Sequence, residues 1–206
     1  MAQLELVHPA PLDLAESEPR GDHAAIARMV EDGARVLDVG CGDGALIRLL
    51  KRECAARARG MELDPAKVHG CVARGLSVVQ GDAERDLEHF PSAAFDYVIF
   101  SHALLKLRRP LAVLKTAARV GERVIVSFDN AGHWSKRVRL LARGRLAGWG
   151  DAAPVSVRDF AEAARDMRLT IERAVPLSRG HQGAPFAKTI WRANWFAEQA
   201  VFLLSP

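Results

Sequence analysis

The stretch VLDVGCGDG, residues 36–44, places three glycines and two aspartates directly after the start of an apolar run. A glycine-rich turn between a strand and a helix brings backbone N–H groups close to a ligand, because no side chain stands between them. The pattern therefore predicts a strand over residues 35–39, a helix over 45–54 and a ligand-binding turn that joins them. Units of this kind build parallel sheets, so this feature favours an α/β fold.

The rest of the chain continues the alternation of short β-branched runs with helical patterns. Ser156 with Asp159 three residues later is typical of a helix cap. A doubly wound α/β fold is expected. The expected strands are 35–39, 59–63, 76–80, 95–101, 123–128, 169–175 and 195–204, and the expected helices are 45–54, 66–74, 110–120, 134–143 and 157–167.

The composition indicates one globular domain that spans residues 1–206. The chain has 206 residues, of which 49% are hydrophobic and 26% charged, enough for a full core. No apolar run reaches the roughly 18 to 20 residues of a membrane span, and the acidic, proline-broken start does not look like a signal peptide. We therefore expect no membrane association and a cytoplasmic protein. The three cysteines form no CxxC pair, so we expect buried thiols and no metal site.

Acidic residues at strand ends indicate what the glycine turn binds. The glycines follow the pattern GxGxG rather than GxGxxG, and Asp43 would repel a diphosphate. Asp38 suits a ligand with positive charge, such as S-adenosyl-L-methionine with its sulfonium and ammonium groups. Glu62 follows 62 − 38 = 24 residues later, near the usual offset of a ribose-binding acid, and Asp82 is placed to bind the adenine amino group. Each acid alone could be a loop residue or helix cap, but three in register favour the cofactor.

Several motifs carry a family resemblance. VLDVGCGDG, GMELDP, VVQGDAERDLEHFP and FDYVIFSHALL resemble successive motifs of class I S-adenosylmethionine-dependent methyltransferases. RGDHAAIARMV, VGERVIVSFDNAGHWSKRVRLLARGRL and VSVRDFAEAARDMRLTIERAVPL narrow the match to the MetW family of bacterial methionine-biosynthesis proteins, over most of the chain.

The resemblance implies a single Rossmann-like class I methyltransferase domain. Its mostly parallel seven-stranded sheet would have helices on both faces and an antiparallel last strand. Residues 1–34 would form an N-terminal arm and helix, 35–129 the cofactor-binding half and 130–206 the acceptor or partner half. The resemblance also implies a partner, homoserine O-acyltransferase.

The expected site residues follow from these motifs. Arg20 and Asp22, just before the first helix, are expected to close over the carboxylate end of the cofactor. Catalytic residues stay open, with Ser101, His102 and His133 as weak candidates and Asp129 and Asn130 beside them on the acceptor side. The residues expected to bind S-adenosyl-L-methionine, or its product S-adenosyl-L-homocysteine, are Arg20, Asp38, Gly40, Cys41, Gly42, Gly44, Glu62, Leu63, Gly81, Asp82, Ala83 and Ser101.

Three functions remain open at this point. The chain is an accessory subunit of homoserine O-acyltransferase, a stand-alone methyltransferase for a small-molecule acceptor, or a nucleic-acid enzyme. The net charge of +4 and the segment 133–150, which contains no acidic residue, favour the nucleic-acid enzyme. Against it, FSHALL lacks the Asp/Asn-Pro-Pro-aromatic motif of amino-directed nucleic-acid methyltransferases, and no Pro-Cys nucleophile occurs. We therefore favour the accessory subunit and leave open whether methyl transfer takes place.

Overall fold

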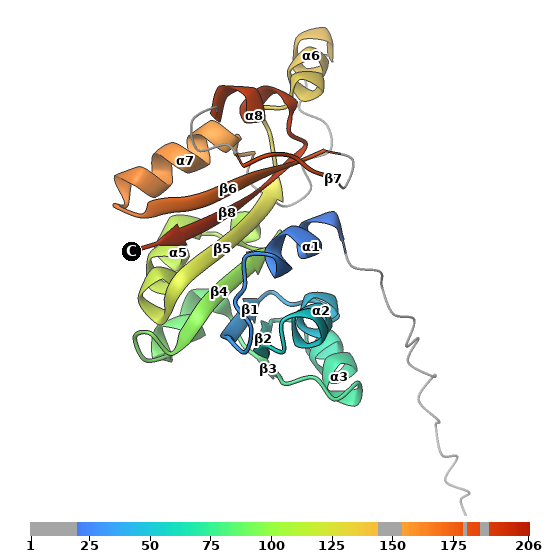
Figure 1. The fold of residues 1–206 in the computed structure, drawn as a ribbon, viewed down its shortest axis with the longest axis vertical. Helices are drawn as coiled ribbons and strands as arrows, with labels where there is room; N and C mark the ends of the chain where they lie inside the picture. Colours follow the sequence, from blue (N-terminus) through green and yellow to red (C-terminus); the bar gives the residue numbers. More distant parts are fainter. Residues whose placement is uncertain (1–19, 144–153, 179–180, 186–189) are drawn as a thin grey trace, which may run out of the picture.

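The computed structural model describes residues 20–143, 154–178, 181–185 and 190–206. Within them one mixed sheet carries helices on both faces (Figure 1). The strands are β1 (Arg35–Val39), β2 (Arg57–Glu62), β3 (Val78–Gln80), β4 (Phe95–Ser101), β5 (Gly121–Asp129), β6 (Thr170–Ser178), β7 (His181–Gln182) and β8 (Gln199–Ser205).

The sheet order is β3-β2-β1-β4-β5-β8-β6-β7. The first five strands of this order pair in parallel, whereas β8 pairs antiparallel with both β5 and β6, and β7 pairs antiparallel with β6. The seven expected strands are present. The eighth is β7, whose two residues are too few to leave a periodic pattern in the sequence.

Helices cover both faces of this sheet. They are α1 (Gly21–Ala27), α2 (Ala45–Glu53), α3 (Pro65–Ala73), α4 (Ala83–Asp86), α5 (Pro110–Val120), α6 (Trp134–Arg143), α7 (Val157–Asp166) and α8 (Ile190–Phe196), with 3-10 turns η1 (Leu87–His89) and η2 (Leu104–Lys106). The expected cap of α7 is present as a capping box: the Ser156 side chain accepts from the Asp159 N–H, and the Asp159 side chain accepts from the Ser156 N–H.

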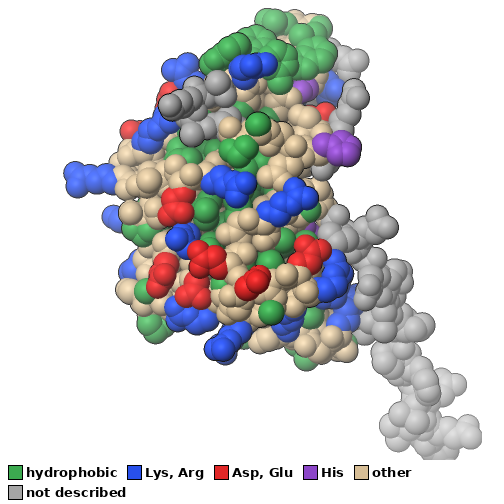
Figure 2. All heavy atoms as spheres, in the orientation of Figure 1, with side chains coloured by type: hydrophobic (Ala, Val, Ile, Leu, Met, Phe, Trp, Pro, Cys, Tyr) green, Lys and Arg blue, Asp and Glu red, His purple; other side chains and the backbone are tan. Residues whose placement is uncertain are grey.

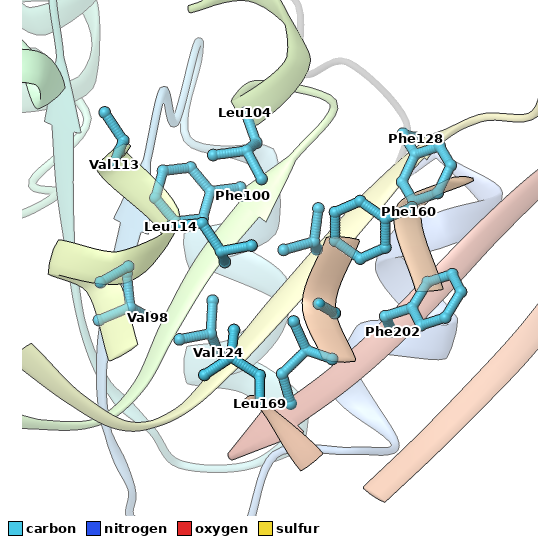
Figure 3. Packing of buried hydrophobic residues seen from close by; sticks show 14 of the residues in the cluster. Val98, Phe100, Leu104, Val113, Leu114, Val124, Phe128, Phe160, Leu169 and Phe202 are labelled. Carbon is cyan, nitrogen blue, oxygen red and sulfur yellow. The ribbon is translucent and has the colours of Figure 1, made fainter. Parts of the chain in front are cut away.

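The two faces of the sheet have separate cores because side chains alternate along each strand. Along β4, Val98 and Phe100 pack in one core, with α5 and α7, while Tyr97 and Ile99 pack in the other, with α1 and α2. Figure 3 shows the first core, where Phe100 and Leu114 lie near Val124. Burial on both faces explains why central strands read as continuous apolar runs.

One expected element was wrong in part. The sequence predicts a strand from residue 195, but the helix α8 runs to Phe196 and β8 begins only at Gln199. Trp191 and Trp195 are four residues apart, which is helical spacing, and both are exposed as they would be on one side of a helix. The aromatic content suggested a strand, and the period of four should have suggested a helix.

Candidate functional site

A cavity of about 620 Å³ opens at the carboxyl ends of β1, β2 and β4. Beside β1 the strand order reverses direction, because the chain first builds outward to β2 and β3 and then returns to β4. Open α/β sheets bind ligands at this switch point. Residues from α1, the β1–α2 turn, the end of β2 and the end of β4 line the cavity.

The glycine turn forms one wall of the cavity. Gly42 has a φ of +58°, and a Cβ built on it would have no atom within 4 Å, so a side chain there would enter the space beside the turn. Gly40 and Cys41 also line the cavity. Gly44 does not, because its missing side chain makes room for Leu76 and Cys71 instead. Two of the three glycines therefore line the cavity, although a Cβ on Gly40 would also lie 2.8 Å from the Ala103 Cβ.

Asp38 is the buried charge of the site. Its side chain lines the cavity and is 1% exposed, and its Oδ1 has no hydrogen-bond partner among the described residues. Burial raises the pKa of Asp38 to about 7, against the opposing charge of Arg20. A buried carboxylate without a partner is costly, so this wall favours a ligand that brings a positive charge or a hydrogen-bond donor.

Glu62 supports the turn and faces the cavity as well. Its Oε2 accepts a hydrogen bond from the Gly42 N–H at 2.8 Å. Its Oε1 accepts from the N–H groups of Leu63 and Asp64 at 3.0 and 3.1 Å. A carboxylate has about four acceptor positions, so roughly one remains for a ligand. The sequence predicted only the ligand role, because the hydrogen bond from Gly42 depends on how β1 and β2 lie side by side.

The start of α1 closes the opposite wall. Asp22 is fully buried and accepts hydrogen bonds from Ser101 Oγ and Ser127 Oγ, both at 2.6 Å. Burial alone would raise the pKa of Asp22, but these hydrogen bonds and the charge of Arg20 outweigh it and lower the pKa. Asp22 therefore ties α1 to β4 and β5 and is absent from the cavity wall, whereas Arg20 and Ser101 line it.

Two histidines also line the cavity. His102 has a φ of +53°, unusual for a residue with a side chain, and its two ring nitrogens lie 3.7 and 3.8 Å from carboxylate oxygens of Asp22 and Asp129. His23 is 5% exposed and was not expected from the sequence, although its position one turn after Arg20 could have indicated it. Burial lowers the pKa of both histidines, which favours neutral imidazoles.

Other expected residues lie elsewhere. His133 contacts Ser135 Oγ at 2.8 Å before the start of α6 and does not line the cavity. Asn130 is fully buried and binds backbone groups of α7 and α8, so it is part of the framework. Asp82 caps α4 by accepting from the Glu84 N–H at 2.9 Å. Of the residues expected to bind the cofactor, the structure does not bring four to the cavity wall: Gly44, Gly81, Asp82 and Ala83.

Several lining residues were not singled out as binding residues. Besides His23 they include Lys67, Ala103, Lys106 and Leu107. In the described ranges no three side chains are grouped so that they could hold a metal ion. No described helix combines the length and apolar character needed to cross a membrane.

The sequence of this chain is similar to those of known proteins. The family model described as "Methionine biosynthesis protein MetW" matches residues 20–204. A bifunctional methionine biosynthesis protein MetXA/MetW from Rhodopirellula baltica is 29% identical over 132 residues, 60% of this chain and 21% of that protein. An uncharacterized methyltransferase from Schizosaccharomyces pombe is 36% identical over 92 residues, 41% of this chain and 35% of that protein. The matches thus span about a fifth and about a third of these relatives.

Solved structures share the fold. A SAM-dependent methyltransferase from Thermotoga maritima, a possible histamine N-methyltransferase, is 15% identical with a TM-score of 0.66 over 89% of this chain and 86% of that one. An S-adenosylmethionine-dependent methyltransferase from Mesorhizobium loti is 14% identical with a TM-score of 0.64 over 90% and 98%. These likenesses confirm the expected class I methyltransferase fold. Because the family model covers nearly all of the described residues, the chain belongs to the MetW family of methionine biosynthesis proteins.

Proposed function

We propose that the cavity binds S-adenosylmethionine or S-adenosylhomocysteine, and that the chain acts as an accessory subunit of homoserine O-acyltransferase. The observation that carries the first part is the unpartnered Oδ1 of buried Asp38. The α-ammonium group of either ligand would donate a hydrogen bond to this oxygen and neutralise the buried carboxylate. The open space beside Gly42 supports the same ligand, because a chain without bulky branches fits closely against a glycine backbone.

Other residues of the cavity would complete the binding site. Glu62 would use its remaining acceptor position for the ribose hydroxyls, and Arg20 would lie near the ligand carboxylate. Asp82 stays a prediction for the adenine amino group, and it would have to bind in addition to capping α4. We assign cofactor binding to residues 35–129 together with the start of α1, and partner binding to residues 130–206.

The proposed partner rests on the relative from Rhodopirellula baltica, whose name joins MetXA and MetW in one protein. A linker between two domains raises their effective concentration, so fusion in one protein can replace the association of two separate chains in another. The family resemblance points to homoserine O-acyltransferase as the associated enzyme. We infer that this chain binds the acyltransferase and raises its activity.

Isothermal titration calorimetry of the full chain tests both parts. We expect it to bind S-adenosylhomocysteine, and then to bind the cognate acyltransferase from the same organism. Acyltransferase activity should rise when the chain is added, with no conversion of S-adenosylmethionine. If the chain does not bind S-adenosylhomocysteine, the cofactor assignment is refuted. If it does not bind the acyltransferase, the accessory role is refuted.

A stand-alone small-molecule methyltransferase is the second candidate function, because of His102. This residue lines the cavity in a strained backbone conformation, and burial lowers its pKa, which favours the neutral imidazole. S-adenosylmethionine would supply an activated methyl group on its sulfonium, so the protein would mainly have to orient an acceptor and take its proton. Formation of S-adenosylhomocysteine with a metabolite, lost in His102→Ala, would favour this function over the accessory role.

A further inference from the structure

Exposed apolar side chains gather on the two helices α6 and α8. Eleven large hydrophobic side chains are exposed among the described residues, and seven of them lie on these helices. Figure 1 shows α6 beyond the end of the sheet, and Figure 2 shows hydrophobic side chains gathered there. We define the α6–α8 surface by Trp134, Val138 and Leu141 of α6 and Trp191, Trp195 and Phe196 of α8.

Hydrogen bonds hold α8 to the body of the chain, and Arg137 joins α6 to α8. Asn130, at the end of β5, donates from Nδ2 to carbonyl oxygens of α8 and of Ala197, and its Oδ1 accepts from the N–H groups of Gly132 and Val157. The Arg137 guanidinium lies over the Trp195 ring at 4.6 Å, and its Nε donates to the Gly132 carbonyl at 2.6 Å. These contacts bring α6 and α8 together, so their exposed side chains form one surface.

The charges on these helices are all positive. The α6 sequence WSKRVRLLAR and the α8 sequence IWRANWF contain basic residues and no acidic residue. Burial lowers the pKa of Lys136, and the nearby charges of Asp129 and Glu198 oppose this shift. These two acids belong to the end of β5 and to the segment before β8, and not to the two helices. Two copies that met through this surface would place like charges opposite each other, which disfavours self-association. A partner with carboxylates around an apolar patch is complementary.

A second depression continues the surface at α8. A cavity of about 410 Å³ is lined by Arg192 and Phe196 of α8, by Pro176 and Ser178 of β6, and by Ala184 and Pro185. Protein interfaces often concentrate their binding energy in pockets lined by aromatic and arginine side chains. The cavity suits an apolar side chain of the partner with a carboxylate close to Arg192.

We propose that the α6–α8 surface docks the chain onto homoserine O-acyltransferase, against an apolar patch of that enzyme bordered by carboxylates. This inference rests on the proposed accessory function and adds the place and chemistry of the contact. The surface lies apart from the cofactor cavity, since none of its residues lines that cavity. Substitutions on the surface should therefore leave ligand affinity unchanged.

The test uses the full chain and the cognate acyltransferase, with the dissociation constant measured by biolayer interferometry. The double variant Leu141→Ser/Trp191→Ser removes two side chains that are 87% and 63% exposed, so the fold should not depend on them. We expect the dissociation constant to rise about tenfold or more. The matched control is Leu111→Ser/Val72→Ser, at exposed positions of α5 and α3, and it should bind as the wild type does.

A second pair of variants tests the charge complementarity. Arg139→Glu/Arg192→Glu should slow association about threefold or more and reduce its dependence on salt, because complementary charge mainly steers encounter. Lys115→Glu on α5 is the control. Arg137 is unsuitable here, because it supports Trp195 and Gly132 and its loss would disturb the surface itself.

The outcomes separate this inference from the function on which it rests. If the wild type binds and both surface variants bind equally well, the inference is overturned and the accessory role stands. If the wild type does not bind the acyltransferase, the accessory role fails, and the inference fails with it. If the wild type binds phosphatidylserine-containing vesicles and the double variant does not, the surface is a membrane contact and the inference is overturned. If the wild type forms a concentration-dependent dimer and the double variant does not, the surface joins two copies of this chain, and the inference is again overturned.

Discussion

Replacing Asp38 by asparagine should stabilise the ligand-free chain at neutral and alkaline pH. The Asp38 side chain is 1% exposed, and burial raises its pKa from 3.8 to about 7. The unfolded chain therefore releases this proton near pH 4, whereas the folded chain keeps it until about pH 7. Asparagine has nearly the same shape and no charge, so the variant avoids burying a carboxylate.

The magnitude follows from the two pKa values. Their difference, 7 − 3.8, is about 3, and each pKa unit corresponds to 1.36 kcal/mol, so the upper limit is about 4 kcal/mol. Because the pKa of Asp38 is higher in the folded chain than in the unfolded chain, the contribution of this carboxyl to the free energy of unfolding is fully present below about pH 4. It is lost as the pH rises through about 7, and it stays lost above. The variant and the wild type should thus differ little near pH 4 and by about 2 to 4 kcal/mol at pH 8.

The same substitution should weaken ligand binding. A bound ammonium group favours ionised Asp38, so wild-type affinity for S-adenosylhomocysteine should rise with pH up to about 7 and then level off, with release of a proton on binding. Asp38→Asn should lose about 1.5 to 3 kcal/mol of affinity, the usual contribution of a charged hydrogen bond. Its remaining affinity should vary less across this range.

Urea unfolding at pH 4 and pH 8 measures the stability difference, and calorimetry in buffers of different ionisation enthalpy measures proton release. Asp96→Asn is the matched control, because a hydrogen bond from Arg35 lowers the pKa of Asp96 and the sign of the stability change should reverse. Parallel pH profiles for wild type and Asp38→Asn would refute the raised pKa. If Asp38→Asn binds the ligand as tightly as the wild type does, the ammonium group binds elsewhere.

Three further changes have defined outcomes. Gly42→Val should abolish S-adenosylhomocysteine binding in calorimetry, whereas Gly33→Val, with similar positive φ and open space, should cost stability but keep affinity. Equal ligand affinity of the two variants would show that Gly42 does not lie against the ligand. Glu62→Gln should lower affinity by about 1 to 3 kcal/mol and also lower the Tm, since backbone N–H groups lose a charged acceptor. Asn130→Ala should lower stability by about 3 kcal/mol in urea unfolding, and an unchanged midpoint would refute its framework role.

The sequence by itself determined the strand–turn–helix units and the side of the sheet on which the cavity lies. These follow from local rules: glycine at positive φ, alternation along strands, and the fact that parallel strands place their carboxyl ends together. Asp38 and Glu62 reach the cavity wall for that reason, because each stands within or at the end of a parallel strand. Asp82 obeys the same rule but caps α4, since a strand-end acid has two uses that sequence cannot distinguish.

The tertiary structure decided which groups share charge and hydrogen bonds. Asp22 binds Ser127 across 105 positions of sequence, and Asn130 holds helix α8 from the end of β5. No periodicity encodes such pairs, because they depend on how whole elements pack. The raised pKa of Asp38 is equally nonlocal, since desolvation depends on everything that surrounds the carboxylate. The exposed aromatic surface of α6 and α8 likewise appears only after folding, when the other apolar side chains have found a core to enter.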